Sequence, residues 1–310
     1  MRKKILILTI LLFFTIFSFW GWRFYSSRNY CAIPIGFLPY ADTVYAIVEI
    51  QGQKYRLNLD LGLTFFCELK KQVLESLDKE LVGNTRSVGI RGDHFVSSVY
   101  SLPQVKIGRA RYFHVQVREQ RDEFEKRTVL FPSKKDGGLM QEKKEYENAI
   151  SGYLGLGLFL YSTPVLFLDL QNSSVFMVKD LRRFHEVPYS PEKMAQVPLQ
   201  VENGYLVIEV ETDFGRRRFL LDTGATLNLL KPSFLIDGEE ILSCLEKKII
   251  SSATFQVGGV DLGSEDFCLF PMSSDLGEID GILGMSFFRK YAIFLDFQNH
   301  VAYIGSTIGS

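Results

Sequence analysis

The stretch Phe219-Leu220-Leu221-Asp222-Thr223-Gly224-Ala225-Thr226-Leu227-Asn228-Leu229-Leu230 places one carboxylate between two apolar runs. The first run is typical of a buried strand, and the Thr-Gly pair after Asp222 is typical of a tight turn. A buried carboxylate without a partner is costly, so its position at the end of a strand suggests a function. Thr223 and Thr226 supply hydroxyls, and Gly224 lets the backbone approach closely. Asp and Gly are nevertheless common in turns, so a single Asp-Thr-Gly turn predicts little.

The same pattern occurs a second time, in the first half of the chain. Residues 45–59 have the pattern of two apolar strands joined by a Gly turn, and they lead into Asp60-Leu61-Gly62-Leu63-Thr64. Residues 205–221 repeat this order ahead of Asp222. Gly152-Tyr153-Leu154-Gly155 and Gly281-Ile282-Leu283-Gly284 form a later shared signature, each followed by an apolar strand that ends in Asp. Two signatures in the same order in each half indicate an internal duplication.

The composition is compatible with two packed β lobes. A length of 310 residues predicts about two domains, and 46% of the residues are hydrophobic. Apolar and β-branched runs separated by Gly, Asn and Asp recur throughout, so we expect an all-β fold with few helices. Lys+Arg 35 against Asp+Glu 36 leaves a formal charge of -1, which argues against nucleic acid as a partner.

The four cysteines and four histidines show no metal-binding spacing, neither CxxC nor HExxH. We therefore expect no metal site, and the chain predicts no cofactor. Cys244 and Cys268 lie in the same half of the chain. They form a disulfide in an oxidising compartment, or they are two buried thiols.

The N-terminus predicts a membrane anchor. Arg2-Lys3-Lys4 precede an almost unbroken apolar run from Ile5 to Trp22. The run is longer than the core of a cleaved signal peptide, and no A-x-A-like cleavage site follows it. We expect a transmembrane signal anchor at residues 1–25, a tether at 26–42, and export of the rest into the periplasm. A buried core helix is the alternative, which the apolar circumference disfavours.

The remaining chain divides into two lobes of unequal length. We expect the first lobe at 43–180, a Pro-containing linker at 181–200 and the second lobe at 201–310. Residues 119–148 are rich in Lys and Glu and predict a solvated insertion in the first lobe. Residues 67–81 have helical composition, and residues 88–96 predict a hairpin with a Gly-rich tip.

The repeated carboxylate suggests acid–base chemistry. Duplicated halves commonly pack about a pseudo-two-fold axis, which would bring Asp60 and Asp222 together. Two carboxyls within hydrogen-bond distance share one proton, because both cannot ionise cheaply. The ionised member deprotonates a water, and the protonated member polarises a carbonyl and passes a proton to the leaving amine. Thr64 and Thr226, each four residues after an Asp, are expected to hydrogen-bond the outer carboxylate oxygens.

These motifs resemble the pepsin and retropepsin-type aspartic proteases, over roughly residues 44–304. The resemblance implies a bilobal β fold with one Asp per lobe, supported by Gly62, Thr223 and Gly224. It also implies an extended polypeptide substrate, a monomer with both lobes in one chain, and a flap from the first lobe. By position the flap tip consists of Gly89, Ile90, Arg91, Gly92 and Asp93. With its N-terminal anchor, the chain is similar to bacterial retropepsin-like periplasmic proteins.

One departure from the family lies in the first Asp turn. Leu61 stands where the family has Thr, and in the family the two threonines each bond the opposite backbone across the lobe interface. Thr223 is therefore expected to lack its mirror partner, at a cost of about 1 kcal/mol for one hydrogen bond. Tyr153-Leu154 also replaces the usual small aliphatic pair. Leu61→Thr is expected to leave activity unchanged or to raise it.

Three functions fit the sequence. The first is an aspartic endopeptidase that uses Asp60 and Asp222. The second, favoured by Leu61, is a non-catalytic protein that binds extended peptides or partner proteins in the cleft. The third is an unrelated β-barrel whose Asp-Gly turns are only turns. Three other polar residues are expected to have no catalytic role: Asp169 and Asp296 at hairpin turns, and His94 as a solvated side chain.

Overall fold

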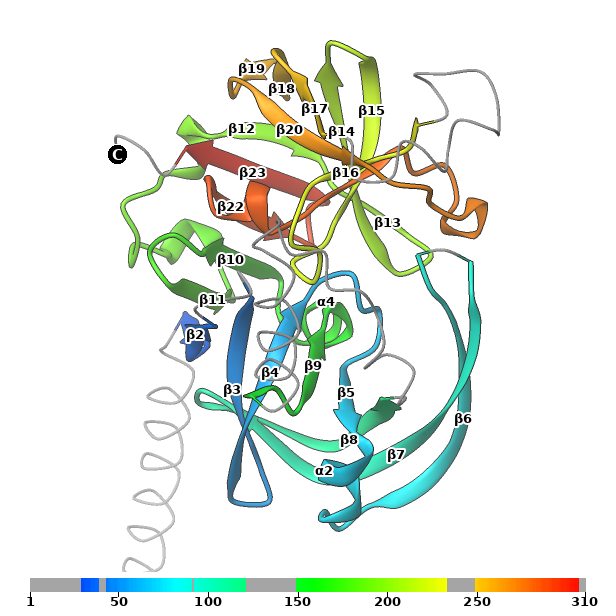
Figure 1. The fold of residues 1–310 in the computed structure, drawn as a ribbon. Helices are drawn as coiled ribbons and strands as arrows, with labels where there is room; N and C mark the ends of the chain where they lie inside the picture. Colours follow the sequence, from blue (N-terminus) through cyan, green and yellow to red (C-terminus); the bar gives the residue numbers. More distant parts are fainter. Residues whose placement is uncertain (1–28, 39–42, 91, 121–148, 233–248, 307–310) are drawn as a thin grey trace, which may run out of the picture.

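The computed structural model describes residues 29–38, 43–90, 92–120, 149–232 and 249–306. Figure 1 shows two β lobes, the first from the blue-to-green part of the chain and the second from the yellow-green-to-orange part. The predicted all-β bilobal fold is confirmed. Several predicted features lie outside the described residues: the anchor at 1–25, most of the insertion at 119–148, Arg91 and Cys244. Within the described ranges, no helix is both long enough and apolar enough to cross a bilayer.

An eight-stranded sheet forms the first lobe. Its spatial order is β2 (Ile35–Phe37), β3 (Val44–Ile50), β4 (Gln53–Asp60), β9 (Gly152–Gly155), β5 (Cys67–Lys70), β8 (Ala110–Gln120), β7 (His94–Ile107) and β6 (Glu80–Val88). β3 also pairs with β7, which curls the sheet. Buried and half-buried residues alternate along β3, because one face of the strand covers the core. At the β3–β4 turn, Gln51 and Gly52 both have positive φ (50° and 82°), as a tight hairpin requires.

The second lobe repeats this plan in a nine-stranded sheet. Its strands are β17 (Ile249–Ser252), β20 (Glu265–Leu269), β16 (Leu229–Leu230), β21 (Gly281–Leu283), β15 (Gly215–Leu221), β14 (Tyr205–Thr212), β18 (Phe255–Val257) and β19 (Val260–Asp261), with β13 (Gln200–Glu202) paired to β14. The β14–β15 hairpin corresponds to β3–β4, and β21 corresponds to β9. The short helices α4 (Leu156–Ser162) and α6 (Met285–Phe288) follow the second signature in each lobe.

The second signature supports the Asp turn of its own lobe. β9 runs parallel to β4 and places Gly155 opposite Asp60, and β21 runs parallel to β15 in the same way. A Cβ atom on Gly155 would overlap backbone carbonyl oxygens of the loop that follows Asp60. A Cβ atom on Gly284 would meet the corresponding oxygens after Asp222. Glycine is needed at both positions because the loop lies directly against the backbone there.

A six-stranded sheet joins the lobes. In order it contains β1 (Tyr30–Ala32), β11 (Ser174–Val178), β10 (Val165–Asp169), β22 (Tyr291–Asp296), β23 (Val301–Ser306) and β12 (Ala195–Pro198). Phe167 and Phe294 are opposite one another across β10 and β22, with ring centroids 4.5 Å apart. They hold matching places in the two halves, each two residues before the strand-ending Asp. The pseudo-two-fold axis of the duplication therefore passes between them.

Asp169 and Asp296 stabilise turns at the ends of these strands. Asp169 Oδ1 accepts the backbone N–H of Asn172 at 3.0 Å, and Asp296 Oδ1 accepts that of Asn299 at 2.9 Å. In both cases the Asn side chain donates to the other carboxylate oxygen at 2.8 Å. This geometry agrees with the structural role expected from the sequence.

Two stretches that the sequence suggested were connectors are partly strands. The described part of the predicted tether at 26–42 contains β1, which pairs with β11, and β2, which pairs with β3. The predicted linker at 181–200 contains β12 and the start of β13. These strands are only three or four residues long, so they are too short to show the alternation that identifies longer strands. The helix expected at 67–81 is also shorter, because β5 precedes α2 (Lys71–Glu75).

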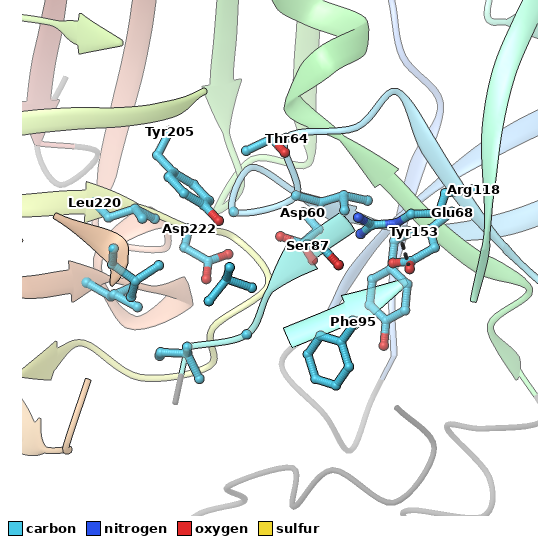
Figure 2. A pocket seen from close by; sticks show the side chains of 17 residues that line it. Asp60, Thr64, Glu68, Ser87, Phe95, Arg118, Tyr153, Tyr205, Leu220 and Asp222 are labelled. Carbon is cyan, nitrogen blue, oxygen red and sulfur yellow. Dashed lines mark hydrogen bonds and ion pairs between the residues drawn. The ribbon is translucent and has the colours of Figure 1, made fainter. Parts of the chain in front are cut away.

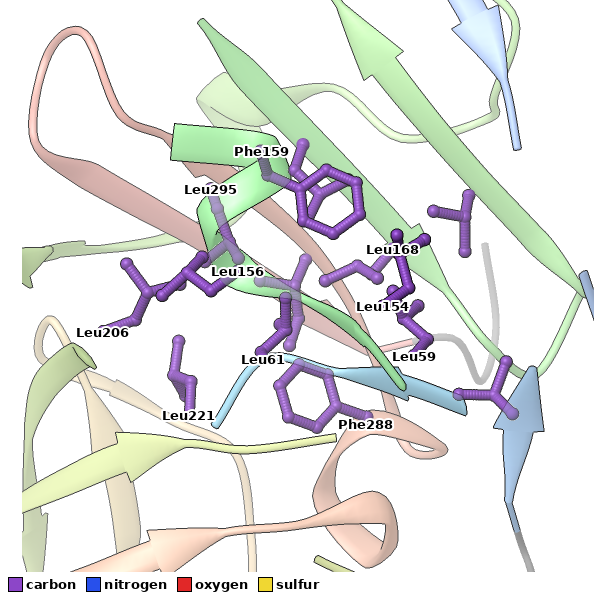
Figure 3. Close-up of a cluster of buried hydrophobic side chains, with 14 of the residues drawn as sticks. Leu59, Leu61, Leu154, Leu156, Phe159, Leu168, Leu206, Leu221, Phe288 and Leu295 are labelled. Atoms are coloured by element: carbon purple, nitrogen blue, oxygen red, sulfur yellow. The ribbon is translucent and has the colours of Figure 1, made fainter. Parts of the chain in front are cut away.

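The hydrophobic core is continuous from one lobe to the other. Buried leucines of both lobes belong to one cluster, which extends under the two Asp turns. Figure 3 shows part of this cluster, in which Leu61 of the first lobe lies near Leu221 of the second. Leu61 has no exposed surface. The two Asp turns therefore rest on a shared apolar base, and their relative position depends on both lobes.

Candidate active site

The structure brings the two repeated carboxyls into one pocket. Asp60 is the last residue of β4, and Asp222 directly follows β15. Both line the same pocket at the lobe interface, where a side-chain hydrogen bond joins them. Figure 2 shows the two carboxyl groups at the centre of this pocket, one from each lobe.

Each Asp lies against the glycine of the opposite turn. A Cβ atom on Gly62 would lie 2.5 Å from Asp222 Cγ, and one on Gly224 would lie 2.6 Å from Asp60 Cγ. Non-bonded carbon atoms are optimally about 3.5–4.0 Å apart, so neither position has room for a side chain. The two Asp-x-Gly turns thus cross at the seam, and each glycine makes space for the carboxyl of the other lobe.

The environments of the two carboxyls differ. Burial raises the pKa of Asp60, and the charge of Asp222, their shared hydrogen bond and the charge of Glu68 raise it further, well above its usual range. Burial also raises the pKa of Asp222, but the hydrogen bond from Asp60 and nearby backbone N–H groups oppose this. The Gly224 N–H donates to Asp222 Oδ1 at 2.7 Å. The two carboxyls therefore titrate as a coupled pair, and the backbone N–H groups around Asp222 favour its ionised form.

Thr223 links the lobes from beneath the dyad. Its side chain is 1% exposed, and its Oγ1 accepts the Leu61 N–H at 3.0 Å and donates to the Leu59 carbonyl at 2.7 Å. Leu61 stands at the matching position of the first lobe, and a leucine side chain has no hydroxyl to make the mirror contacts. Its side chain belongs to the interlobe core instead. The lobe interface beneath the two carboxyls is thus asymmetric: the Thr223 hydroxyl makes hydrogen bonds across it, and Leu61 makes only apolar contacts.

Leu61→Thr tests this asymmetry. The pseudo-two-fold axis places the new hydroxyl toward the second-lobe backbone, where it is expected to complete the clasp and leave peptide cleavage unchanged or raised. Loss of buried apolar volume is expected to lower stability, by about 2 kcal/mol on the scale of large-to-small core substitutions. Cleavage rate and melting temperature of the variant and the parent protein measure the two effects separately. A large fall in activity without unfolding would contradict the assigned interface.

Thr64, which was expected beside the outer oxygen of Asp60, is placed differently. Thr64 is exposed and lines the pocket, but among the described residues its hydroxyl makes no hydrogen bond to Asp60. Its methyl group lies against the turn at Gly204. Thr226 is half-buried, and its carbonyl accepts the Ser286 N–H at 3.2 Å, which ties the Asp222 loop to α6.

The β6–β7 hairpin, which the sequence predicted to be the flap, contributes residues to the lining of the pocket. Gly89 and Ile90 line the pocket, and the Gly89 N–H donates to the Asp93 carbonyl at 2.8 Å across the tip. Gly92 has φ 89° and leaves no room for a side chain beside Ser273 of the second lobe. Arg91 lies outside the described residues.

The flap tip is joined to the second lobe. The Ser273 N–H donates to the Ile90 carbonyl at 2.8 Å. His94 Nε2 lies 3.6 Å from Asp275 Oδ2, although 75% of the His94 side chain is exposed. These contacts hold the flap over the dyad.

Three pocket residues were not identified from the sequence. Tyr205 starts β14, and burial together with the charge of Asp222 raises the pKa of its phenol. Glu68 and Arg118 form a buried ion pair on the first-lobe side, with Arg118 Nε 3.1 Å from Glu68 Oε1. The pair is fifty residues apart in the chain, and neither residue stands in a recognisable motif.

Comparison with solved structures identifies the fold. The chain matches the crystal structure of an aspartic proteinase from Irpex lacteus with a TM-score of 0.55 and 13% sequence identity. The match covers 90% of this chain and 98% of the proteinase chain. The chain therefore has a pepsin-like fold. No family model matches the sequence, and no curated protein matches it either.

Proposed function

We propose that this protein is an aspartic endopeptidase that hydrolyses peptide bonds in extended polypeptide through Asp60 and Asp222. The observation that carries the proposal is the crossed seam, in which each carboxyl occupies the space left by the opposite glycine. A half-buried carboxyl pair coupled by a hydrogen bond lowers the stability of the fold, and it provides an acid and a base side by side.

The proposed roles follow from the two environments. Asp222, whose ionised form is stabilised by backbone N–H groups, takes a proton from water as that water attacks the carbonyl carbon of the scissile bond. Asp60 donates its proton to the carbonyl oxygen, which gives a neutral tetrahedral diol. Collapse of this intermediate breaks the C–N bond, and the proton now on Asp222 passes to the leaving amine. The new carboxyl group returns a proton to the dyad.

Asp222→Asn is expected to abolish cleavage of unstructured peptides, because the amide cannot accept the proton of the attacking water. We expect a loss of at least about 10³-fold in kcat/KM, on the scale of removing a general base together with its electrostatic contribution. The full chain is incubated with a peptide library at several pH values from acidic to neutral, and products are identified by mass spectrometry. Asp78→Asn is the matched control, since Asp78 is exposed and lies outside the pocket.

A non-catalytic peptide-binding protein is the second candidate, and Leu61 favours it because one half of the interlobe clasp is apolar. Peptide binding that is equally strong in the parent protein and in Asp222→Asn, without turnover in either, would support this candidate. Equal cleavage by both proteins would contradict the proposed dyad.

We further propose that the chain is anchored in the cell membrane by residues 1–25 with the two lobes in the periplasm. The basic-then-apolar order of the N-terminal sequence supports this proposal. Fractionation of cells that express the full chain, followed by protease treatment of spheroplasts, tests it: the lobes should be degraded without lysis.

A further inference from the structure

The two lobes present opposite chemistry to the two sides of the dyad. In Figure 2, Tyr205 and Leu220 lie on one side of Asp60 and Asp222, and Arg118, Glu68, Tyr153 and Phe95 lie on the other. On the second-lobe side, the lining leucines and isoleucine belong to an apolar cluster that also receives Ile90 of the flap. The first-lobe side contains a buried ion pair.

The strand registers show that these two sides are matching positions of the duplication. In the second lobe one row crosses five strands, and each residue is the direct neighbour of the next: Val207, Leu220, Ile282, Leu229 and Cys268. In the first lobe the same strands and the same registers give Tyr45, Asn58, Tyr153, Glu68 and Arg118. The apolar row of one lobe is therefore replaced by a polar row in the other.

Burial makes this replacement energetically significant. The Glu68 and Arg118 side chains are 3% and 7% exposed. Desolvating a carboxylate and a guanidinium is costly, and a buried pair often contributes no more to stability than apolar residues of similar volume. The pair is thus poorly explained by stability alone, and its position in the wall of the pocket points to recognition of a ligand.

The donors and charges in this wall define what it can bind. Arg118 carries five N–H donors, and its one hydrogen bond among the described residues runs from Nε to Glu68. The guanidinium also lies over the Phe65 ring, 5.7 Å from the centroid, and this contact restricts its movement together with the hydrogen bond to Glu68. Its remaining donors therefore have a defined direction, as a bidentate acceptor requires.

A charged substrate side chain is disfavoured here. A carboxylate would approach both Glu68 and the ionised dyad, and an ammonium group would approach Arg118. An apolar side chain would leave the donors of Arg118 without an acceptor. A neutral carboxamide avoids all three costs, because its oxygen accepts from Arg118 and its N–H groups donate to oxygen atoms of the wall.

We propose that the first-lobe side of the pocket selects a glutamine or asparagine side chain at one of the two residues flanking the scissile bond, and that Arg118 and Glu68 set this preference. The proposal rests on the proposed peptidase function of the same site. It assigns Arg118 and Glu68 as specificity-determining residues.

The test uses synthetic peptides that differ only in the flanking residue, with Gln, Leu, Glu or Lys at either position. The parent protein is expected to cleave the best Gln peptide with a kcat/KM at least about tenfold above that of the matching Leu peptide, the scale of one buried hydrogen bond to a charged group. The double variant Glu68→Leu with Arg118→Met, which makes the wall apolar, is expected to reverse this order.

The ion pair Glu49–Lys106 supplies the matched control, since it lies outside the pocket. Glu49→Leu with Lys106→Met is expected to keep the Gln preference.

Two further measurements keep the outcomes distinct. Arg118→Lys retains the buried positive charge but loses the paired N–H donors of the guanidinium, so it is expected to lower cleavage of the Gln peptide selectively. This variant keeps the proposal testable if the double variant fails to fold. The same peptides carrying a fluorescent label are titrated with the Asp222→Asn protein, so that the affinity of the first-lobe side of the pocket is measured without cleavage. If the parent protein cleaves none of the peptides, the proposed function is contradicted. If Gln peptides are nevertheless bound more tightly than Leu peptides, the proposed selectivity of the first-lobe side is supported. Cleavage with a preference for Leu, or an unchanged preference in the folded double variant, would overturn the proposal.

Discussion

Gly224→Ala is expected to remove nearly all peptidase activity while the protein still folds. The added methyl carbon would lie 2.6 Å from Asp60 Cγ, so the carboxyl or the turn has to move by about 1 Å to restore van der Waals contact. Misplacing catalytic groups by about 1 Å costs on the order of 100-fold, and here both members of the dyad are affected. We expect a fall of at least this size in kcat/KM, measured on the best peptide of the library.

Gly62→Ala should have the same effect from the other lobe, because its methyl carbon would lie 2.5 Å from Asp222 Cγ. Gly305→Ala is the matched control. The three atoms nearest to its methyl carbon would all belong to Met194, the closest at 3.0 Å, and a methionine side chain moves aside easily. Full activity in the Gly224→Ala protein would mean that the two turns do not cross during catalysis.

Asp60→Asn is expected to change how stability depends on pH, in a direction that the pKa of Asp60 determines. That pKa lies well above the ordinary value of 3.8, with burial as the first cause. Between the two values the folded protein keeps a proton that the unfolded chain has lost, so stability falls as pH rises. The contribution of Asp60 is complete below its unfolded pKa and is lost as pH rises through its folded pKa.

The amide introduced by Asp60→Asn cannot ionise, so this fall should be absent from the variant. Relative to the parent protein, the free energy of unfolding of Asp60→Asn should increase steadily as pH rises above the ordinary carboxyl pKa, with activity lost throughout. Denaturant titrations at several pH values measure the difference. Asp78→Asn, at an exposed site, should show no such trend. A difference between Asp60→Asn and the parent that is independent of pH would contradict the protonated state assigned to Asp60.

The same argument predicts how activity depends on pH. The proposed mechanism needs one proton on the pair, so the rate should fall when Asp222 is protonated at low pH and when Asp60 ionises at higher pH. Because the pKa of Asp60 is raised, the alkaline limb should lie above the usual range of a carboxyl.

Much of the fold follows from local patterns that recur in the sequence. The hairpins before Asp60 and Asp222 alternate regularly, and the Gly-x-x-Gly signatures recur at matching places, so the duplication and the pairing of each signature with its own Asp turn were predictable. The β6–β7 hairpin was predictable as well, because Gly89 and Gly92 mark a turn between two strand-like stretches.

Other elements left little trace in the sequence. β1 and β12 are too short for periodicity, and their place at the two edges of the interlobe sheet depends on partners far along the chain. The Glu68–Arg118 pair could not be identified because fifty residues separate its members, and their contact arises from the parallel pairing of β5 with β8. The ionisation order of Asp60 and Asp222 was also open, since the two motifs are nearly identical.

The amino-acid pattern alone is enough to predict a doubled β structure with one carboxyl at the end of a matching strand in each half. That information is local, because strand alternation and turn residues depend on neighbours a few positions away. The crossing of the two turns, the coupling of Asp60 to Asp222 and the polar side of the pocket follow only from the three-dimensional packing. Each of these depends on which atoms the packing of two lobes brings within a few ångströms, and burial then sets how strongly they interact.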